Sequence, residues 1–325
     1  MISCKTDALT IDEIDIEDHT YQITTASALD HLARSIKDLG LITPPILLKK
    51  KSKYIIISGF KRIAACQKLQ KHTLPARILP DQFSPLTCAE IAIAENRFQR
   101  TLNQVEISRA LNLLDRFVDS PPVSGNILKL LGLPDNPSLT PKLKKLQGLP
   151  VMLQKGLLSG RISMDMALRL DRWRDADGAR LFKIFSVLGL SHSTQKELMT
   201  NLEEIALRED QPITTLLASD DIQGILAAED LDRHQKTKAL RGCVKKRRYP
   251  HLYVAEKQFA DALKHIKLGN RMSLKPADYF EGTSMTLQIS FNNIEELHDD
   301  LATLNREINK PHLTNLINSK YSPDL

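Results

Sequence analysis

Apolar positions near the start of the chain change period several times, and each change marks an element. Helical spacing comes first, at Leu29, Leu32, Ile36 and Leu39. Ser27 and Asp30 can form a capping box at the start of this helix, and Gly40 ends it. Short apolar runs then predict strands over 45–48, 54–58 and 74–79, with a helix over 62–69. This pattern predicts a small mixed sheet with helices.

The middle of the chain is predicted to be helical. One helix is expected over 84–96, opened by a serine and a proline, and another over 103–118, opened by Asn103 with Glu106. A breaker follows at 119–122, then short helices to about residue 210. The segment 211–250 is predicted to hold weakly packed helices that end in a basic run.

The last part of the chain forms a separate block. Over 283–291 apolar and polar residues alternate strictly, which predicts a half-buried strand. A helix follows with a heptad-like apolar seam at Leu297, Leu301, Leu304 and Ile308. One small block can hardly bury both the apolar face of the strand and the apolar seam of the helix, so a symmetric partner is expected. The alternative is that both pack on the helix over 252–266 of the same chain.

Composition narrows the class of protein. The 325 residues contain 42% hydrophobic and 26% charged residues, which fits a globular protein of two or three domains. Neither a membrane span nor a secretory signal is visible, and the four cysteines (Cys4, Cys66, Cys88, Cys243) are too far apart in sequence for a local zinc knuckle. We therefore expect a cytoplasmic protein.

Charge is distributed unevenly around a net value of +6. Basic residues cluster over 49–62, 129–161 and 236–248, and the only acidic residue within these three segments is Asp135. Such clusters suggest contacts with polyanions, and solvated lysine faces are the alternative.

A glycine turn offers the first candidate chemistry. An apolar strand ends at Gly59, and Phe60, Lys61 and Arg62 begin the next helix. Free N–H groups at a helix start favour an anion, and an arginine can bind phosphate through two donors. The stretch therefore suggests a phosphate site, or else a common glycine turn with exposed bases.

Glu95 and Asn96 form a second candidate site, for a metal ion. A carboxylate beside a carboxamide supplies oxygen ligands of the kind that magnesium takes together with phosphate oxygens. Arg97 and Arg100 could hold further phosphate groups. Helix capping is the alternative explanation for this pair.

Two short helices over 123–132 and 139–148, with a glycine at the corner, form a helix-turn-helix pattern. Leucines occupy one face of the second helix, and the outer face, suited to the major groove of DNA, carries Thr140, Lys142, Lys144 and Lys145. An ordinary helical hairpin is the alternative.

Taken in order, these stretches resemble the ParB family of chromosome and plasmid partition proteins. The family's box Gly-Glu-Arg-Arg-x-x-Ala-Ala is similar to Gly59-Phe-Lys-Arg-Ile-Ala-Ala65, and its box Glu-Asn-x-Gln-Arg-x-x-Leu-x-Pro-x-Glu is similar to 95–106. The helix ending Ser-Ile-Lys-x-x-Gly-x-x-Gln-Pro is similar to 35–44. The segment 146–164 and the last block also follow the family's order.

The resemblance implies an α+β fold in four parts: a ParB/sulfiredoxin-like domain (1–102), an all-helical helix-turn-helix domain (103–210), a basic helical linker (211–250) and an αββα-type dimerisation domain (251–325). It implies a CTP-gated dimeric clamp on a palindromic, centromere-like site in double-stranded DNA. Expected partners are a second copy of the chain and a ParA-type ATPase, on the nucleoid and with no membrane.

The resemblance also assigns residues. Nucleotide contacts fall on Thr43, Pro44, Gly59, Phe60, Lys61, Arg62, Gln99 and Arg100, and Mg²⁺ on Glu95 and Asn96. DNA contacts fall on Ser138, Thr140, Lys142, Lys144, Lys145, Arg161 and Ser163.

The chain departs from the family pattern at several positions. Phe60 replaces a glutamate that is linked to hydrolysis, so we expect a slow CTPase at most. Thr43 replaces a glutamine and Gln104 replaces a proline. The Gln-Arg pair of the second box, Gln99-Arg100, lies one position later than in the family. A competing interpretation is a ParB-fold transcriptional regulator that has lost the nucleotide switch. A third interpretation is an enzyme of the sulfiredoxin type, which uses a cysteine inside the phosphate box. Here Cys66 lies outside that box and is expected to be buried as a small apolar residue, which argues against the enzyme.

Overall fold

Five strands form the mixed sheet that the apolar runs predict. The three predicted strands are β3 (Ile46–Lys50), β4 (Lys53–Ser58) and β5 (Thr73–Leu79). The sequence pattern does not predict β1 (Lys5–Thr10) or β2 (Ile14–Asp15), which have little apolar alternation and are short. The order is β1-β5-β3-β4-β2, with β1–β5 and β3–β4 antiparallel and the other two pairs parallel.

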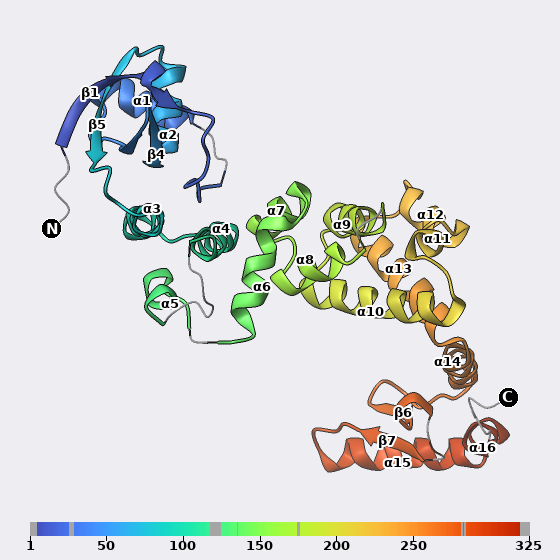
Figure 1. The fold of residues 1–325 in the computed structure, drawn as a ribbon. Helices are drawn as coiled ribbons and strands as arrows, with labels where there is room; N and C mark the ends of the chain where they lie inside the picture. The colour runs from blue at the N-terminus through green and yellow to red at the C-terminus, as the bar shows by residue number, and fades with distance from the viewer. Residues whose placement is uncertain are drawn as a thin grey trace. The chain divides into compact units, whose positions relative to one another are not determined.

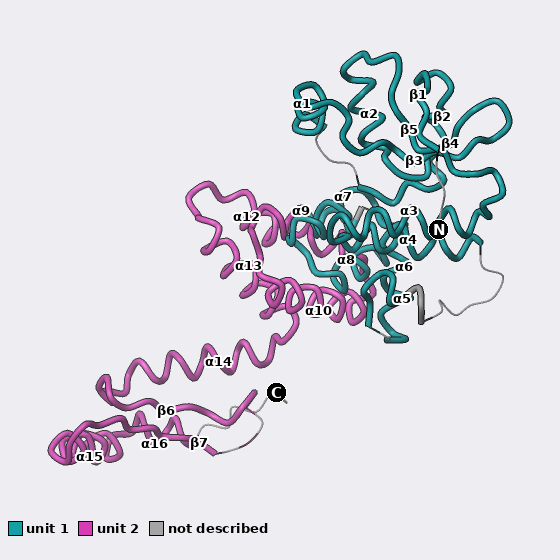
Figure 2. Tube along the Cα trace, turned by 90° about the vertical axis from the view of Figure 1, so that its left-hand side faces the viewer, with its two compact units in different colours: residues 1–182 teal, residues 183–325 magenta. Residues whose placement is uncertain are grey.

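This computed structural model describes residues 5–25, 29–117, 125–134, 136–173, 176–280, 282 and 284–318. The chain divides into two compact units, residues 1–182 and residues 183–325 (Figure 2).

Two helices pack with the sheet of the first unit (Figure 1). α1 (Asp30–Leu39) ends at Gly40, which has a φ of +77°, as predicted. Its predicted cap Ser27 lies outside the described residues. α2 (Phe60–Lys68) begins two residues earlier than predicted because Gly59 turns the chain in the left-handed region. The core between them includes Leu47, Ile56, Ile63 and Cys66.

Helices follow the sheet. Ser84 caps α3 (Pro85–Gln99), and Asn103 and Glu106 form the predicted capping box of α4 (Gln104–Asp115). The remaining described helices of this unit are α5 (Gly125–Leu131), α6 (Leu139–Lys145), α7 (Val151–Leu158) and α8 (Met164–Asp171). Three-residue 3-10 turns lie at 11–13 and 146–148.

The next helices are α9 (Ala176–Leu188), which spans the boundary between the units, α10 (His192–Glu209), α11 (Ile213–Leu217), α12 (Asp220–Ala227) and α13 (Arg233–Arg248). The prediction of weak packing over 211–250 is wrong for α13. This helix lies along α10 and buries Leu240 and Val244 (Figure 1).

The end of the chain has the predicted order of helix, two strands and helix. Its elements are α14 (Pro250–Leu263), β6 (Met272–Pro276), β7 (Met285–Ile289), α15 (Ile294–Ile308) and a further α16 (Pro311–Asn318). β6 and β7 pair antiparallel. A separate core forms here, in which Phe259 and Phe280 meet edge to face at 5.8 Å.

Candidate functional site

The turn between β4 and α2 depends on glycine. Gly59 has a φ of +104°, and a Cβ built there would lie 2.7 Å from the Cβ of Pro45 and 2.9 Å from its Cα. No side chain caps α2, because glycine occupies the capping position. The first N–H groups of the helix are therefore left for another acceptor.

A cavity of about 370 Å³ opens at this turn, and we call it the α2 cavity. It collects seven of the eight predicted nucleotide residues together with Asn96, from segments far apart in sequence. The lining residues are Tyr21, Ile23, Thr24, Leu32, Thr43, Gly59, Phe60, Lys61, Arg62, Asn96, Gln99 and Arg100. The sequence does not mark the four that precede Thr43 as site residues. Tyr21, Ile23 and Thr24 lie in an irregular segment without the spacing of a motif, and Leu32 fits the apolar spacing of α1.

Pro44 and Glu95 do not line the cavity. Instead both hold Arg62, whose Nη1 donates to the carbonyl oxygens of Thr43 at 2.9 Å and Pro44 at 3.0 Å. Its Nη2 lies 3.7 Å from Glu95 Oε1, and the arginine side chain is only 14% exposed. Burial lowers the pKa of Arg62, against the opposing effect of Glu95. Arg62 thus fixes the 43–45 loop onto α2 and α3.

The two predicted magnesium ligands differ in their surroundings. Asn96 donates through Nδ2 to the carbonyl of Ala92 at 2.8 Å, which leaves its Oδ1 as an acceptor beside the cavity. Glu95 accepts from Gln99 Nε2 at 2.7 Å as well as facing Arg62. Within the described residues no three His, Cys, Asp or Glu side chains gather as a metal group. The donor set fits magnesium only where phosphate oxygens complete the shell.

Phe60 lines both the α2 cavity and a second cavity of about 360 Å³. The second cavity shares Thr24 and Lys61 with the first as well, and its other lining residues include Glu17, His19 and Gln22. The phenyl ring lies against His19, with ring centroids 6.1 Å apart. Phe60 therefore presents an apolar ring to both cavities.

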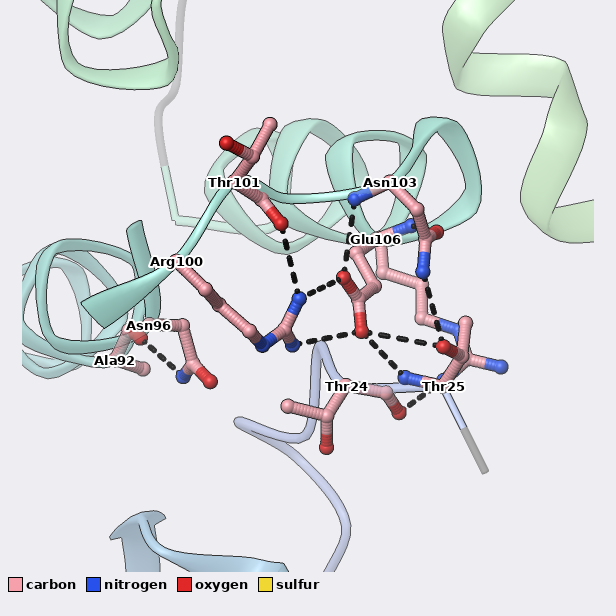
Figure 3. Close-up of polar contacts among 9 residues, drawn as sticks. Thr24, Thr25, Ala92, Asn96, Arg100, Thr101, Asn103 and Glu106 are labelled. Atoms are coloured by element: carbon pink, nitrogen blue, oxygen red, sulfur yellow. Dashed lines mark hydrogen bonds and ion pairs between the residues drawn. The ribbon is translucent and has the colours of Figure 1, made fainter. Parts of the chain in front are cut away.

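Arg100 joins the α2 cavity to a buried carboxylate (Figure 3). Its two terminal nitrogens donate to Glu106 at 2.6 and 2.8 Å, and Glu106 is 1% exposed. Glu106 also accepts from the amide of Thr25, in the chain before α1. Arg109 holds that same segment by donating to the carbonyl of Thr24 at 2.6 Å. Burial and the neighbouring Arg100 lower the pKa of Lys61.

The predicted DNA-reading face of α6 carries fewer free charges than expected. Lys142 pairs with Asp165 at 2.8 Å and Lys144 with Asp115 at 2.5 Å. Lys145 is exposed and has no ion-pair partner among the described residues, and Thr140 is half-buried. The apolar face is as predicted, with Leu143 and Leu146 buried.

The other predicted DNA residues surround α6. Ser163 caps α8 by accepting from the Met166 amide at 3.2 Å, and Arg161, two residues before it, is exposed. Ser138 donates its hydroxyl to Asn136 at 2.9 Å. α4 fixes the end of α6, because Ser108 and Asn112 both donate to the carbonyl of Lys144.

Three arginines of the basic run 236–248 pair with carboxylates of α10, whereas Lys236, Lys238 and Lys246 have no ion-pair partner among the described residues. The expectation of a polyanion surface there stays a prediction. Arg241 meets Glu197 through Nε at 3.1 Å and Nη2 at 2.7 Å. Arg247 donates to Glu209 through Nε at 3.1 Å and Nη2 at 2.6 Å, and Arg248 pairs with Glu204. These arginines are used to pack α13 on α10.

The sheet and the glycine turn at α2 lie within a region of the chain that matches a known family. Residues 4–97 match the family described as ParB N-terminal domain. Curated relatives carry the name "Probable chromosome-partitioning protein ParB": that of Campylobacter jejuni is 40% identical over 83 residues, and that of Helicobacter pylori 28% over 89 residues. The similarity to ParB proteins therefore lies in the N-terminal part of this chain.

The matched regions cover 26% and 27% of this chain, and only 29% and 30% of those two relatives. Solved structures with similarity include truncated ParB from Caulobacter crescentus complexed with CTP-gamma-S (22% identity, TM-score 0.27, 56% of this chain and 98% of that one) and complexed to the centromeric parS site (21%, 0.35, 60% and 98%). A Pnob8-like ParB-N domain is 14% identical, with a TM-score of 0.37 over 76% of this chain and 98% of that one. Among the described helices, none is long and apolar enough to cross a membrane.

Proposed function

We propose that this chain is a site-specific DNA-binding partition protein, and that it works as a dimeric clamp gated by CTP with Mg²⁺. The observation that carries the proposal is the α2 cavity. It brings an open helix terminus together with Lys61, Arg62, Asn96 and Arg100, which lie in two separate sequence boxes. Three cations around uncapped N–H groups fit a polyphosphate.

Each residue has a defined task in this proposal. The α2 terminus and Lys61 receive phosphate oxygens, while Arg62 keeps the 43–45 loop in place. Asn96 and Glu95 would hold Mg²⁺, which supplies charge neutralisation between phosphate groups. Phe60 shields this region from water, so any hydrolysis is slow.

DNA binding is assigned to α6 and the start of α8. Replacing Lys142, Lys144 and Lys145 together by alanine should weaken operator binding and flatten the dependence of log K on log salt by about 0.9 for each DNA phosphate that is no longer neutralised. The matched control replaces Lys37, Lys68 and Lys71, which are exposed on the sheet domain outside the three basic clusters. An unchanged affinity and salt slope in the α6 variant would reject this surface.

Dimerisation is assigned to α15. This helix buries polar groups against its own chain: Asp300 is 7% exposed and binds Arg271, and Glu307 is 4% exposed and binds Lys310. Half of its apolar seam stays open, since Leu301 is 45% and Ile308 50% exposed. Leu297 is half-buried, and Leu304 packs on the core that also holds Phe259 of α14. A second copy would cover that seam, and two-fold symmetry suits a palindromic DNA site.

A ParB-fold transcriptional regulator without a nucleotide switch is the second candidate. The observation that favours it is Arg62, whose Nη1 already donates to two carbonyls and whose Nη2 faces a carboxylate of its own domain. The sulfiredoxin-type enzyme has no such support. Cys66 is fully buried within α2, and burial raises the pKa of its thiol.

Calorimetric titration separates the two candidates. The full chain is titrated with CTP and with ATP, in the presence of magnesium and a palindromic DNA fragment that the protein protects from nuclease. Arg100→Ala should weaken CTP binding, and the matched control is Arg34→Ala, which replaces an exposed arginine of α1 outside the cavity. Absence of heat from both nucleotides would leave the regulator. If the titration supports the CTP-gated clamp, we also expect a ParA-type ATPase as a partner and association with the nucleoid.

A further inference from the structure

Glu106 is the most heavily hydrogen-bonded side chain beside the α2 cavity. Its carboxylate accepts from both terminal nitrogens of Arg100, from the Thr25 amide at 2.9 Å and hydroxyl at 3.2 Å, and from the Asn103 amide at 3.1 Å. These donors come from three segments: the chain before α1, the end of α3 and the start of α4 (Figure 3). Glu106 therefore ties the three segments to one buried charge.

The charge on this carboxylate is maintained. Burial opposes ionisation, but the hydrogen bonds from Arg100, Thr25 and Asn103 outweigh it and hold the pKa of Glu106 below its ordinary value. A buried carboxylate with all these donors is a fixed anchor rather than a proton donor.

Arg100 is held by only one of its two donor edges. The edge formed by Nη1 and Nη2 faces Glu106, and Nη1 also donates to the Thr101 carbonyl at 3.2 Å. Within the described residues no acceptor takes the Nε–H. The edge that includes Nε lies on the side of Asn96 and Thr24, both of which line the cavity (Figure 3).

We propose that Glu106 is a positioning residue for phosphate binding: it holds Arg100 by one edge so that the other edge faces the α2 cavity, and it thereby links an anion bound there to the Thr25 segment and to α4. This inference rests on the proposed nucleotide site and adds to it a residue that touches no ligand. A guanidinium can bridge two anions because its planar fork has two separate bidentate edges. Lys61 supplies the additional positive charge that a second anion requires.

The test uses the full chain and two probes, inorganic tripolyphosphate and CTP, both with magnesium. Glu106→Gln keeps the shape of the side chain but removes its charge, and it should weaken both probes by about tenfold. The matched control is Glu197→Gln, which breaks a similar two-bond pair with Arg241 in the second unit and should leave binding unchanged. Unchanged or tighter binding by Glu106→Gln would overturn the inference while leaving the nucleotide site intact.

A second measurement distinguishes positioning from a merely structural role. In the unmodified protein, saturating tripolyphosphate should slow hydrogen exchange at the amides of Thr25 and Asn103. In Glu106→Gln the same saturation should leave those two amides unprotected. Equal protection in both proteins would show that Glu106 does not transmit binding.

Arg100→Lys provides an independent variant in case Glu106→Gln does not fold. Lysine keeps the charge but has no second edge, so tripolyphosphate affinity should fall by a similar factor. Affinity equal to that of the unmodified protein would overturn the inference. If the unmodified protein binds neither probe, the proposed nucleotide site fails and this inference fails with it.

Discussion

Replacing Gly59 by alanine perturbs the turn on which the α2 cavity depends. An L-residue at a φ of +104° is strained by about 1–2 kcal/mol. The new Cβ would also lie 2.7 Å from the Cβ of Pro45, closer than such atoms approach, so the 43–45 loop must shift. Together we expect a loss of about 2–3 kcal/mol in the free energy of local opening.

Hydrogen exchange of the full chain measures this loss where it occurs. Amides of α2 and β3 should exchange roughly 30- to 140-fold faster in Gly59→Ala, while amides of the second unit keep their rates. The cavity should suffer too, because a displaced loop moves the Thr43 and Pro44 carbonyls that hold Arg62.

Gly160→Ala is the control for backbone strain alone. Gly160 also has a positive φ, +70°, but nothing lies within 4 Å of its built Cβ. Its local amides should therefore show only the smaller backbone cost. If the two variants lose the same stability, the contact with Pro45 contributes nothing and the reasoning about the cavity is wrong.

Three further outcomes are expected. Because the pKa of Glu106 is lowered in the fold, its stabilisation is present above about pH 4.3 and is lost as pH falls through the folded value; the stability difference from Glu106→Gln, followed by denaturant titration, should shrink from pH 5 to pH 3. Leu301→Asp should convert the dimer to monomer in sedimentation, whereas Ala302→Asp beside the seam should not, and a monomeric unmodified chain would refute the dimer. Glu209→Gln should destabilise α13 packing by at most about 1 kcal/mol, an effect that 1 M salt removes.

Local sequence was sufficient for the elements that depend on neighbours in the chain. The Asn103–Glu106 capping box, the stop at Gly40 and the glycine turn before α2 each need residues only a few positions apart. The two boxes also placed most of the lining of the α2 cavity correctly, because family motifs mark those positions directly.

Only the tertiary structure decided which charges remain available. Lys144 is neutralised by Asp115, and Arg248 by Glu204, across long stretches of sequence. Glu106 looks like half of a capping box in the sequence, yet in the fold it also binds Thr25, 81 residues away. Charge clusters predict a local density of cations, but burial and partners depend on long-range packing, which no periodicity along the chain records.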